Sequence, residues 1–156
     1  AEAAAIVTLT VPFSHQAATL ELVKPALQGK ILIDVTVPLV PPKVARVQLP
    51  AQGSAGQIAQ ELLGEGVDVV SAFQNVAAVH LQEGHGLECD VLVTGNKKAA
   101  RDEVVKLVEA AGMRGLHAGM INNAAAAEAL TSVLITINKQ YGCHAGIKIT
   151  GLDDTH

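Results

Sequence analysis

The sequence predicts an α/β protein built on a mostly parallel β-sheet with helices on both faces. Of its 156 residues, 49% are hydrophobic but only 2% are aromatic, and strands buried on both faces favour Val, Ile and Leu. Strand-like apolar runs also alternate along the chain with helix-like patterns, which is typical of βαβ units. The length suits a compact domain that buries a sizeable core.

The expected strands are short apolar runs, several of them rich in β-branched residues and closed by a turn signal. They span residues 6–11, 30–35, 67–73, 89–95, 114–118 and, near the C-terminus, 146–150. The run at 6–11 stops at Pro12, and three prolines force an extended loop after the second strand.

The expected helices span residues 14–28, 54–63, 98–111 and 124–139. Ser14 can cap the first helix, and Ser54 with Gln57 forms a plausible capping box for the second. Asn122 or Asn123 is expected to cap the last helix. That helix is apolar nearly all round, so we expect it to be buried or packed on another subunit. A homodimer is the default expectation.

Composition and charge argue against several classes of partner. With 11 Lys+Arg against 15 Asp+Glu and a pI near 5.8, no nucleic acid is expected. The longest apolar run, 124–137, contains Glu128 and is shorter than the roughly 20 residues that span a bilayer, so no membrane partner is expected. Cys89 and Cys143 form no CxxC pair and the histidines lack metal-ligand spacing. We therefore expect no metal and a reduced, cytoplasmic protein.

The candidate ligand site lies where the first three strands end, because open parallel sheets bind ligands beyond the carboxyl ends of their strands. The segments there are 10–15, 36–41 and 74–78, and they hold small apolar groups and amides. Such a surface suits a flat ring system, and Gln74 and Asn75 are expected to contact it. His15 either reaches a ribose or phosphate or is solvated. Asp34 is expected to brace its loop through a hydrogen bond.

The usual phosphate-binding signal of a dinucleotide fold is absent. A GxGxxG motif directly after a first strand would open a helix and hold the pyrophosphate. Here Gly64 and Gly66 precede a strand, and Gly84 and Gly86 open no expected helix. If the chain has a nucleotide-binding fold, its pyrophosphate half is expected to lie outside these 156 residues.

Several short pieces, taken in order, resemble one known family. They are Val11-Pro12, the loop 38–41, the run 69–78, Ala118-Gly119, the stretch 128–131 and Gly146-Ile147-Lys148. In order and approximate spacing they resemble the NADPH-dependent deazaflavin (coenzyme F-420) reductase family. The resemblance implies an incomplete Rossmann NAD(P)-binding domain in 1–120, lacking its N-terminal βαβ unit. A small C-terminal extension, 121–156, would complete the deazaflavin cleft.

The resemblance also implies the coenzymes and the residues that bind them. The coenzymes are NADP and coenzyme F-420, and hydride passes directly between them, so no catalytic side chain is expected. The segments that match NADP contacts contain Thr10, Pro12, Ser14, Val40 and Ala78, with Val11 and His15 beside them. Those that match deazaflavin contacts contain Gln74, Val76, Ala77 and Ala145, with Asn75 between them. The family usually has His-Thr-Ile-Pro where this chain has Gln74-Asn75-Val76-Ala77, so a ring contact there can differ.

Two other readings remain open at this point. The chain could be an NAD(P)-dependent reductase with another acceptor, such as an imine or a ferric chelate. It could also be a non-catalytic association module built around the helix 124–139. Under the leading reading, the resemblance covers roughly the C-terminal two-thirds to three-quarters of such an enzyme. The chain alone is then expected to bind NADP weakly and could be inactive by itself, because the glycine loop supplies much of the dinucleotide affinity.

Overall fold

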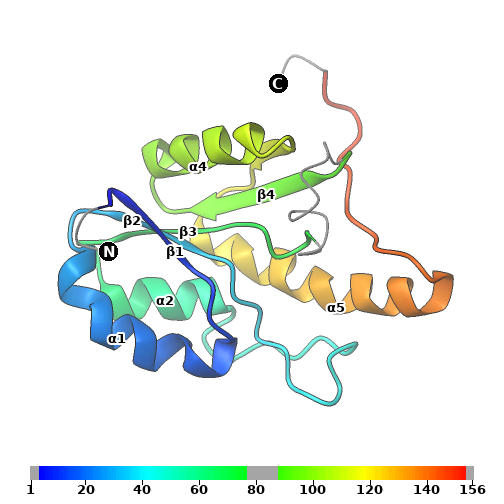
Figure 1. The fold of residues 1–156 in the computed structure, drawn as a ribbon, viewed down its shortest axis with the longest axis horizontal. Helices are drawn as coiled ribbons and strands as arrows, with labels where there is room; N and C mark the ends of the chain where they lie inside the picture. The colour runs from blue at the N-terminus through cyan, green and yellow to red at the C-terminus, as the bar shows by residue number, and fades with distance from the viewer. Residues whose placement is uncertain (1–3, 77–87, 154–156) are drawn as a thin grey trace.

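The structure is a computed structural model, and it describes residues 4–76 and 88–153. In these residues five strands form one sheet in the order β1-β2-β3-β4-β5 (Figure 1). The strands are β1 (Ile6–Leu9), β2 (Ile31–Asp34), β3 (Asp68–Ser71), β4 (Asp90–Gly95) and β5 (Arg114–His117). All neighbouring pairs are parallel except β3 and β4, which are antiparallel. The predicted mostly parallel, Rossmann-like sheet is therefore confirmed.

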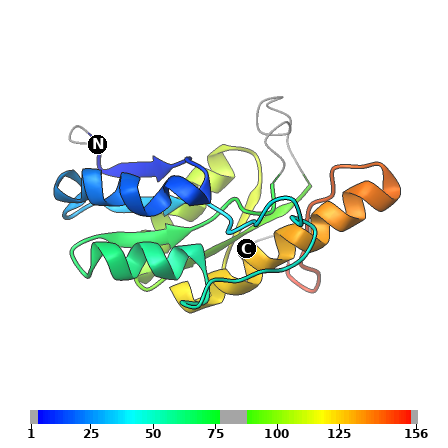
Figure 2. The same ribbon diagram turned by 90° about the horizontal axis from the view of Figure 1, so that it is seen from below.

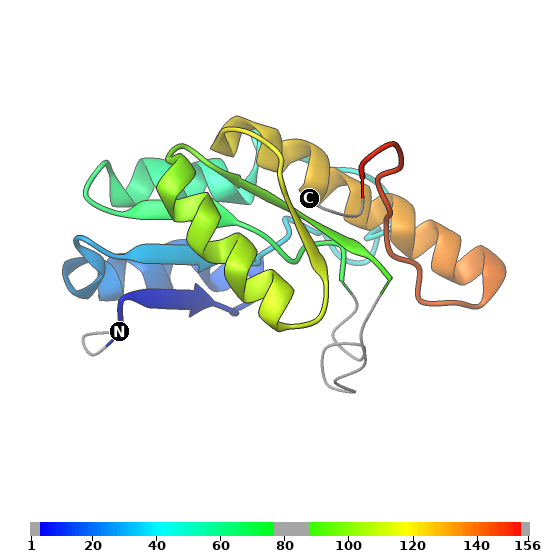
Figure 3. The same cartoon turned by 90° about the horizontal axis from the view of Figure 1, so that it is seen from above.

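Helices cover both faces of this sheet, as predicted. They are α1 (Gln16–Leu27), α2 (Ala55–Leu63), α4 (Lys98–Ala110) and α5 (Ala124–Tyr141), with the 3-10 turns η1 (Phe13–His15) and η2 (Ile121–Asn123). Figure 2 shows α1, α2 and the first turns of α5 on one face. Figure 3 shows α4 lying across the other face. The second half of α5 extends beyond the sheet (Figure 1).

The apolar runs of the strands are continuous because both faces are covered. Successive side chains of a strand point to opposite faces, so Leu32 and Val69 pack against α1 and α2. Their neighbours Ile33 and Val70 pack against α4. The helices contribute matching apolar residues, Leu20 and Leu63 on one side and Val104 on the other. The core therefore consists of two apolar layers, one on each side of the sheet.

The predicted C-terminal strand, residues 146–150, is wrong. The segment runs beside the amino end of β4, where the Ile147 carbonyl accepts a hydrogen bond from the Asp90 N–H at 2.8 Å. The next bonds go to side chains instead of a strand. The Ile149 N–H donates to Asp90 Oδ2 at 2.6 Å, and Arg114 Nη2 donates to the Ile149 carbonyl at 2.7 Å. An ion pair therefore replaces the backbone ladder that a strand requires.

Helix ends agree only partly with the capping predictions. Ser54 caps α2 as expected, because its Oγ accepts from the Gln57 N–H at 3.0 Å. Ser14 lies inside η1 and makes no capping hydrogen bond, so the predicted cap is wrong. Asn123 also fails to cap α5, since its side chain donates to the Ala118 carbonyl at 2.8 Å. Both α1 and α5 are preceded by a 3-10 turn, and backbone groups satisfy part of their first turn.

A buried polar cluster joins α1, β2 and α2. Asp34, at the end of β2, accepts from the Thr36 N–H at 2.8 Å and from Gln16 Nε2 at 2.7 Å. Gln16 Nε2 also donates to the Ala55 carbonyl at 2.8 Å. The predicted loop-bracing role of Asp34 is confirmed. Because burial outweighs these hydrogen bonds, the pKa of Asp34 is raised.

Glu128 attaches α5 to the amino end of α2. Its Oε1 accepts from the Ala55 N–H at 2.6 Å and its Oε2 from the Gly56 N–H at 3.1 Å. The first N–H groups of a helix have no partner inside the helix, so this carboxylate satisfies two of them. Glu128 is only 1% exposed, and burial raises its pKa to about 7. Asp34 adds a smaller effect in the same direction.

Within the described residues, no helix is long and apolar enough to cross a membrane. The cysteines Cys89 and Cys143 are both free thiols.

The first prediction concerns the Asp90–Arg114 pair that anchors the C-terminal segment. We expect Asp90→Asn to lower the free energy of unfolding at neutral pH by about 2 kcal/mol, less than a fully buried pair because Arg114 remains partly exposed. Urea denaturation should show this loss, with Glu103→Gln as the matched control, because its surface pair with Lys106 contributes less than about 0.5 kcal/mol. Arg114 holds the pKa of Asp90 below its usual value, so the stabilisation is present near neutral pH and is lost on acidification. Equal losses in the two variants would contradict this assignment.

The second prediction concerns the pH dependence of stability. Since the pKa of Glu128 rises from 4.5 to about 7 on folding, the unfolded chain loses this proton first as pH increases. The free energy of unfolding should then fall by about 3 kcal/mol between roughly pH 4.5 and pH 7. Thermal melts across this range should show the decline, and Glu128→Gln should flatten most of it. A wild-type chain whose stability rises through this window would refute the assignment.

Candidate functional site

A cavity of about 550 Å³ lies at the carboxyl ends of β1, β2 and β3. Its volume falls in the range of small-molecule sites, roughly 300–1,000 Å³. It is lined by Thr8, Thr10, Val35, Phe73, Gln74, Val76 and Ala111. Three of the predicted site residues, Thr10, Gln74 and Val76, are thus brought together around one cavity.

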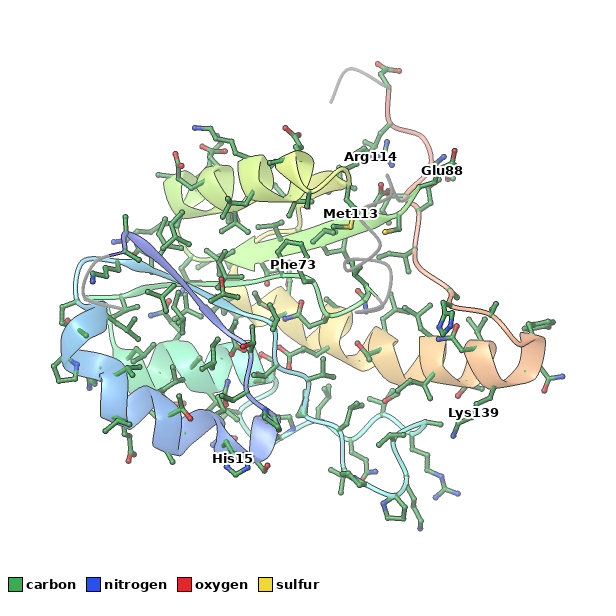
Figure 4. The ribbon with its side chains drawn as sticks, viewed as in Figure 1. His15, Phe73, Glu88, Met113, Arg114 and Lys139 are labelled. Carbon is green, nitrogen blue, oxygen red and sulfur yellow. The ribbon has the colours of Figure 1, made fainter. Side chains whose placement is uncertain are left out.

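The segment after β3 forms one wall of this cavity and turns sharply at Phe73. Phe73 has a φ of 71°, a left-handed conformation that a bulky residue rarely adopts and that costs about 1–3 kcal/mol. Surrounding contacts must hold this turn in place. Phe73 packs against the layer beneath α4 and also lines the cavity. Figure 4 shows it between β3 and β4.

The side chains of Gln74 and Asn75, both in this wall, are hydrogen-bonded in opposite directions. Gln74 Nε2 donates to the Asp34 carbonyl at 2.9 Å and to Ser71 Oγ at 2.8 Å, which ties it to the ends of β2 and β3. Asn75 turns the other way, toward α5, and its Nδ2 donates to the Ala127 carbonyl at 2.8 Å. The Thr131 hydroxyl donates to the Gln74 carbonyl at 2.9 Å. The wall is therefore fixed from both the sheet and α5.

The lining of the cavity is electrically neutral. The seven residues that line it in the described part of the chain are Thr, Val, Phe, Gln and Ala, none of which ionises near neutral pH. The site thus offers apolar contact and a few hydroxyl and amide groups, which suit a flat heterocycle. None of these described lining side chains is suited to transfer a proton near neutral pH.

The predicted residues that follow Thr10 continue along the cavity edge but are not among its lining residues. Val11 and Pro12 continue from Thr10 into η1, where the Pro12 carbonyl accepts from the His15 N–H at 2.9 Å. Ser14 and His15 are exposed. In Figure 4 His15 lies beside the start of α1, well away from Phe73. A ligand that extends out of the cavity toward the start of α1 would be needed to reach them.

The remaining predicted residues lie elsewhere or outside the described range. Val40 is exposed on the long loop between β2 and α2. Asn75 borders the wall but faces α5, as described above. Ala145 follows α5, where its N–H donates to Asn138 Oδ1 at 2.6 Å, at the end of the helix remote from β1 (Figure 1). Ala77 and Ala78 lie outside the described residues.

Four lining residues are not among the predicted ones: Thr8, Val35, Phe73 and Ala111. Thr8 interrupts an otherwise apolar run, which is a usable signal for a side chain that faces a cavity. Val35 directly follows β2, so the rule that ligands bind at the carboxyl ends of strands also points to it. Phe73 and Ala111 carry no such signal, because their place depends on a backbone turn and on the packing of α4.

A second cavity, of about 510 Å³, lies at the opposite edge of the sheet. Because β4 runs antiparallel to β3, its carboxyl end reaches that edge, and Asn96 and Lys97 line the cavity there. Lys97 is paired with Asp68 at 2.9 Å, and Glu61 and Glu65 are also in the lining. This charged cavity differs in kind from the neutral one.

Comparisons with known proteins extend over nearly the whole chain. The chain is 34% identical to the F420-dependent NADP reductase of Methanocaldococcus jannaschii over 154 residues, which is 95% of this chain and 69% of that protein. It is 37% identical to the protein of the same name from Methanothermobacter marburgensis over 161 residues, with 99% and 72% covered. No protein-family model matches the chain.

A solved structure agrees with these relatives. The fold superposes with a TM-score of 0.82 on the crystal structure of a candidate F420-dependent NADP reductase from Arthrobacter sp. FB24. The two chains are 26% identical, and the match covers 96% of this chain and 71% of that one. The shared fold, the length of the matches and the level of identity to the curated relatives lead to one conclusion: this chain belongs to the family of F420-dependent NADP reductases.

Proposed function

We propose that the chain serves hydride transfer between NADP(H) and coenzyme F-420, as an NADP-dependent oxidoreductase. The observation that carries this proposal is the neutral cavity at the carboxyl ends of β1, β2 and β3, in a chain whose curated relatives are named F420-dependent NADP reductases. The other two readings, a different acceptor or a non-catalytic module, have no comparable support.

The residues of the cavity fit flat rings. Thr8, Val35, Phe73 and Val76 offer apolar or small surfaces, and Thr10 and Gln74 supply polar groups at the edge. The coenzymes supply the reactivity, since nicotinamide and deazaflavin exchange hydride when their rings stack. The protein orients the rings and excludes water, an effect that can lower the barrier by several kcal/mol.

We further propose which residues approach each coenzyme. Thr10, Val11, Pro12, Ser14, His15, Val40 and Ala78 are assigned to the NADP side, and Gln74, Asn75, Val76, Ala77 and Ala145 to the deazaflavin side. The line from Thr10 to His15 leads out of the cavity toward the start of α1, which supports an extended ligand there. Residues 1–120 are proposed as the NAD(P)-binding part and 121–156 as the extension that completes the cleft. α5 already supports the cavity wall through Ala127 and Thr131.

We also propose that the protein is a cytoplasmic homodimer that binds no nucleic acid. Val133 and Tyr141 on the second half of α5 are 44% and 76% exposed, which supports a second copy packing there. Free Cys89 and Cys143 are compatible with a reducing compartment. The net charge of -4 disfavours binding to phosphate backbones.

The identity of the acceptor can be tested by offering each candidate acceptor together with NADPH. At NADPH concentrations high enough to offset the weak binding expected of this chain, it should reduce coenzyme F-420, seen as loss of the deazaflavin's visible absorption. A cyclic imine and a ferric chelate should leave NADPH unoxidised. Isothermal titration should detect binding of the deazaflavin independently of turnover. Binding of neither coenzyme, or oxidation of NADPH by the imine alone, would refute the proposal.

The cavity can be tested by filling it. Thr8 is an exposed position of β1 that lines the cavity, and Trp is well tolerated in strands. We expect Thr8→Trp to raise the dissociation constant of coenzyme F-420 by at least about tenfold, because the indole occupies the space of the ring. The matched control is Leu22→Trp, at a position of α1 that is 82% exposed. An unchanged dissociation constant in Thr8→Trp would place the ring elsewhere.

The dimer can be tested by placing a charge on α5. Val133→Glu should shift the sedimentation coefficient toward that of a monomer, because an apolar interface tolerates a buried charge poorly. Leu22→Glu, on the outer face of α1, is the control and should leave the oligomeric state unchanged. If the wild-type chain sediments as a monomer at high concentration, the dimer proposal fails.

A further inference from the structure

The Glu128 carboxylate is the contact that sets α5 against α2. It is seated on the N–H groups of Ala55 and Gly56 at 2.6 and 3.1 Å, while Ser54 Oγ serves the next free N–H, that of Gln57. The packing around this seat is tight. A Cβ added at Gly56 would lie 3.0 Å from Ile121 Cδ1 and 3.2 Å from the Ala124 Cβ. The start of α5 therefore has little freedom to slide along α2.

The same turns of α5 hold the cavity wall. The Ala127 carbonyl, one residue before Glu128, accepts from Asn75 Nδ2 at 2.8 Å. Thr131 Oγ1, about one turn later, accepts from Asn75 Nδ2 at 3.3 Å and donates to the Gln74 carbonyl at 2.9 Å. A helix is stiff over so short a distance. A movement of Glu128 relative to α2 must therefore carry Gln74 and Asn75 with it.

We propose that Glu128 is a positioning residue, and that the seat of its carboxylate on α2 sets where α5 holds the Gln74–Val76 wall of the cavity. The carboxylate accepts two N–H bonds when ionised. When it is protonated, one oxygen carries a hydrogen and no longer accepts well from the N–H that faces it. Protonation thus weakens the contact of Glu128 with α2, and the hydrogen bonds between α5 and Asn75 change with it.

The burial of Glu128 and the groups around it bring the protonation of its carboxylate close to neutral pH. Burial raises the pKa of Glu128 to about 7. From β2, Asp34 is the ionisable side chain whose charge acts on it among the described residues. From α2, the two N–H groups act in the opposite direction. Asp34 is itself held by Gln16, which also binds the Ala55 carbonyl, so both carboxylates contact the same end of α2.

Nuclear magnetic resonance of the whole chain tests this coupling without any coenzyme. Between about pH 5.5 and pH 8.5, the side-chain amide of Asn75 and the backbone amide of Gln74 should shift with one midpoint, and the Glu128 carboxyl carbon should share it. The backbone amide signal of Leu27, the last residue of α1, should stay constant. If Glu128 titrates while the Asn75 and Gln74 signals remain flat, the proposal is overturned, and this wild-type experiment decides it even if a variant fails to fold.

Variants separate charge from position. Glu128→Gln should abolish the shared midpoint, while Glu109→Gln, at an exposed position of α4, should keep it. Glu128→Asp keeps the charge but is one methylene shorter, so its Asn75 signal at high pH should move toward the low-pH position of the wild type. A midpoint that survives in Glu128→Gln would assign the titration to another group and overturn the proposal.

The consequence for hydride transfer rests on the proposed function and has its own readout. The pH profile of kcat with both coenzymes should have a limb near the midpoint seen for Asn75, and Glu128→Gln should remove that limb while changing KM less than twofold. Absence of any turnover would count against the proposed function alone, since the resonance experiment is independent of it. Turnover with an identical pH profile in Glu128→Gln would show that the coupling does not reach the reacting rings.

Discussion

The amino end of α2 is the point on which the arrangement of the helices depends. Its free N–H groups are buried where α1, β2 and α5 converge, so they must be satisfied from within the protein. Glu128 and Ser54 do this directly, and Gln16 completes the cluster by joining Asp34 to the Ala55 carbonyl. A single helix end thus brings together segments from residue 16 to residue 128. Loss of any one of these partners leaves a buried polar group without a bond, which typically costs about 1–3 kcal/mol.

The hydrogen bonds around this cluster help to shape the cavity, and the residues at the strand ends determine its chemistry. Gln74 is attached to the end of β2 through the Asp34 carbonyl, and Asn75 is attached to α5. Directly before them the chain passes through Phe73 in a left-handed conformation. A neutral lining is adequate for a reaction in which the coenzymes carry the reactivity, because the protein then has to hold two rings and keep water away. Most of the buried polar contacts lie beside the cavity, and Gln74 connects them to its lining.

The parts of the fold that could be predicted are those that follow from local patterns. The runs around Leu32 and Val69 predict buried strands because both of their faces are covered, and the spacing of Ser54 and Gln57 predicts a cap that the structure contains. The direction of β4 could not be predicted, since a strand buried on both faces shows the same apolar run in either direction. The segment around Ile149 has the alternation of a strand, but its backbone groups bond to the partly exposed Asp90–Arg114 ion pair instead of a ladder, which no local pattern predicts.

The same distinction applies to the candidate site. Thr10, Gln74 and Val76 follow strand ends, so the rule for parallel sheets finds them. The orientation of Asn75 toward Ala127 depends on a contact between residues 52 positions apart, and no local pattern encodes it. The positive φ of Phe73 is likewise imposed from outside, because Phe itself disfavours it.

The reversed direction of β4 has a practical consequence. It places Asn96 and Lys97 at the edge of the sheet opposite the neutral cavity, so the molecule has two chemically distinct ends. A dye or a surface tether attached through Lys97 would leave the neutral end open to the solvent. Immobilised in this orientation, every copy would present the same mouth to dissolved small molecules.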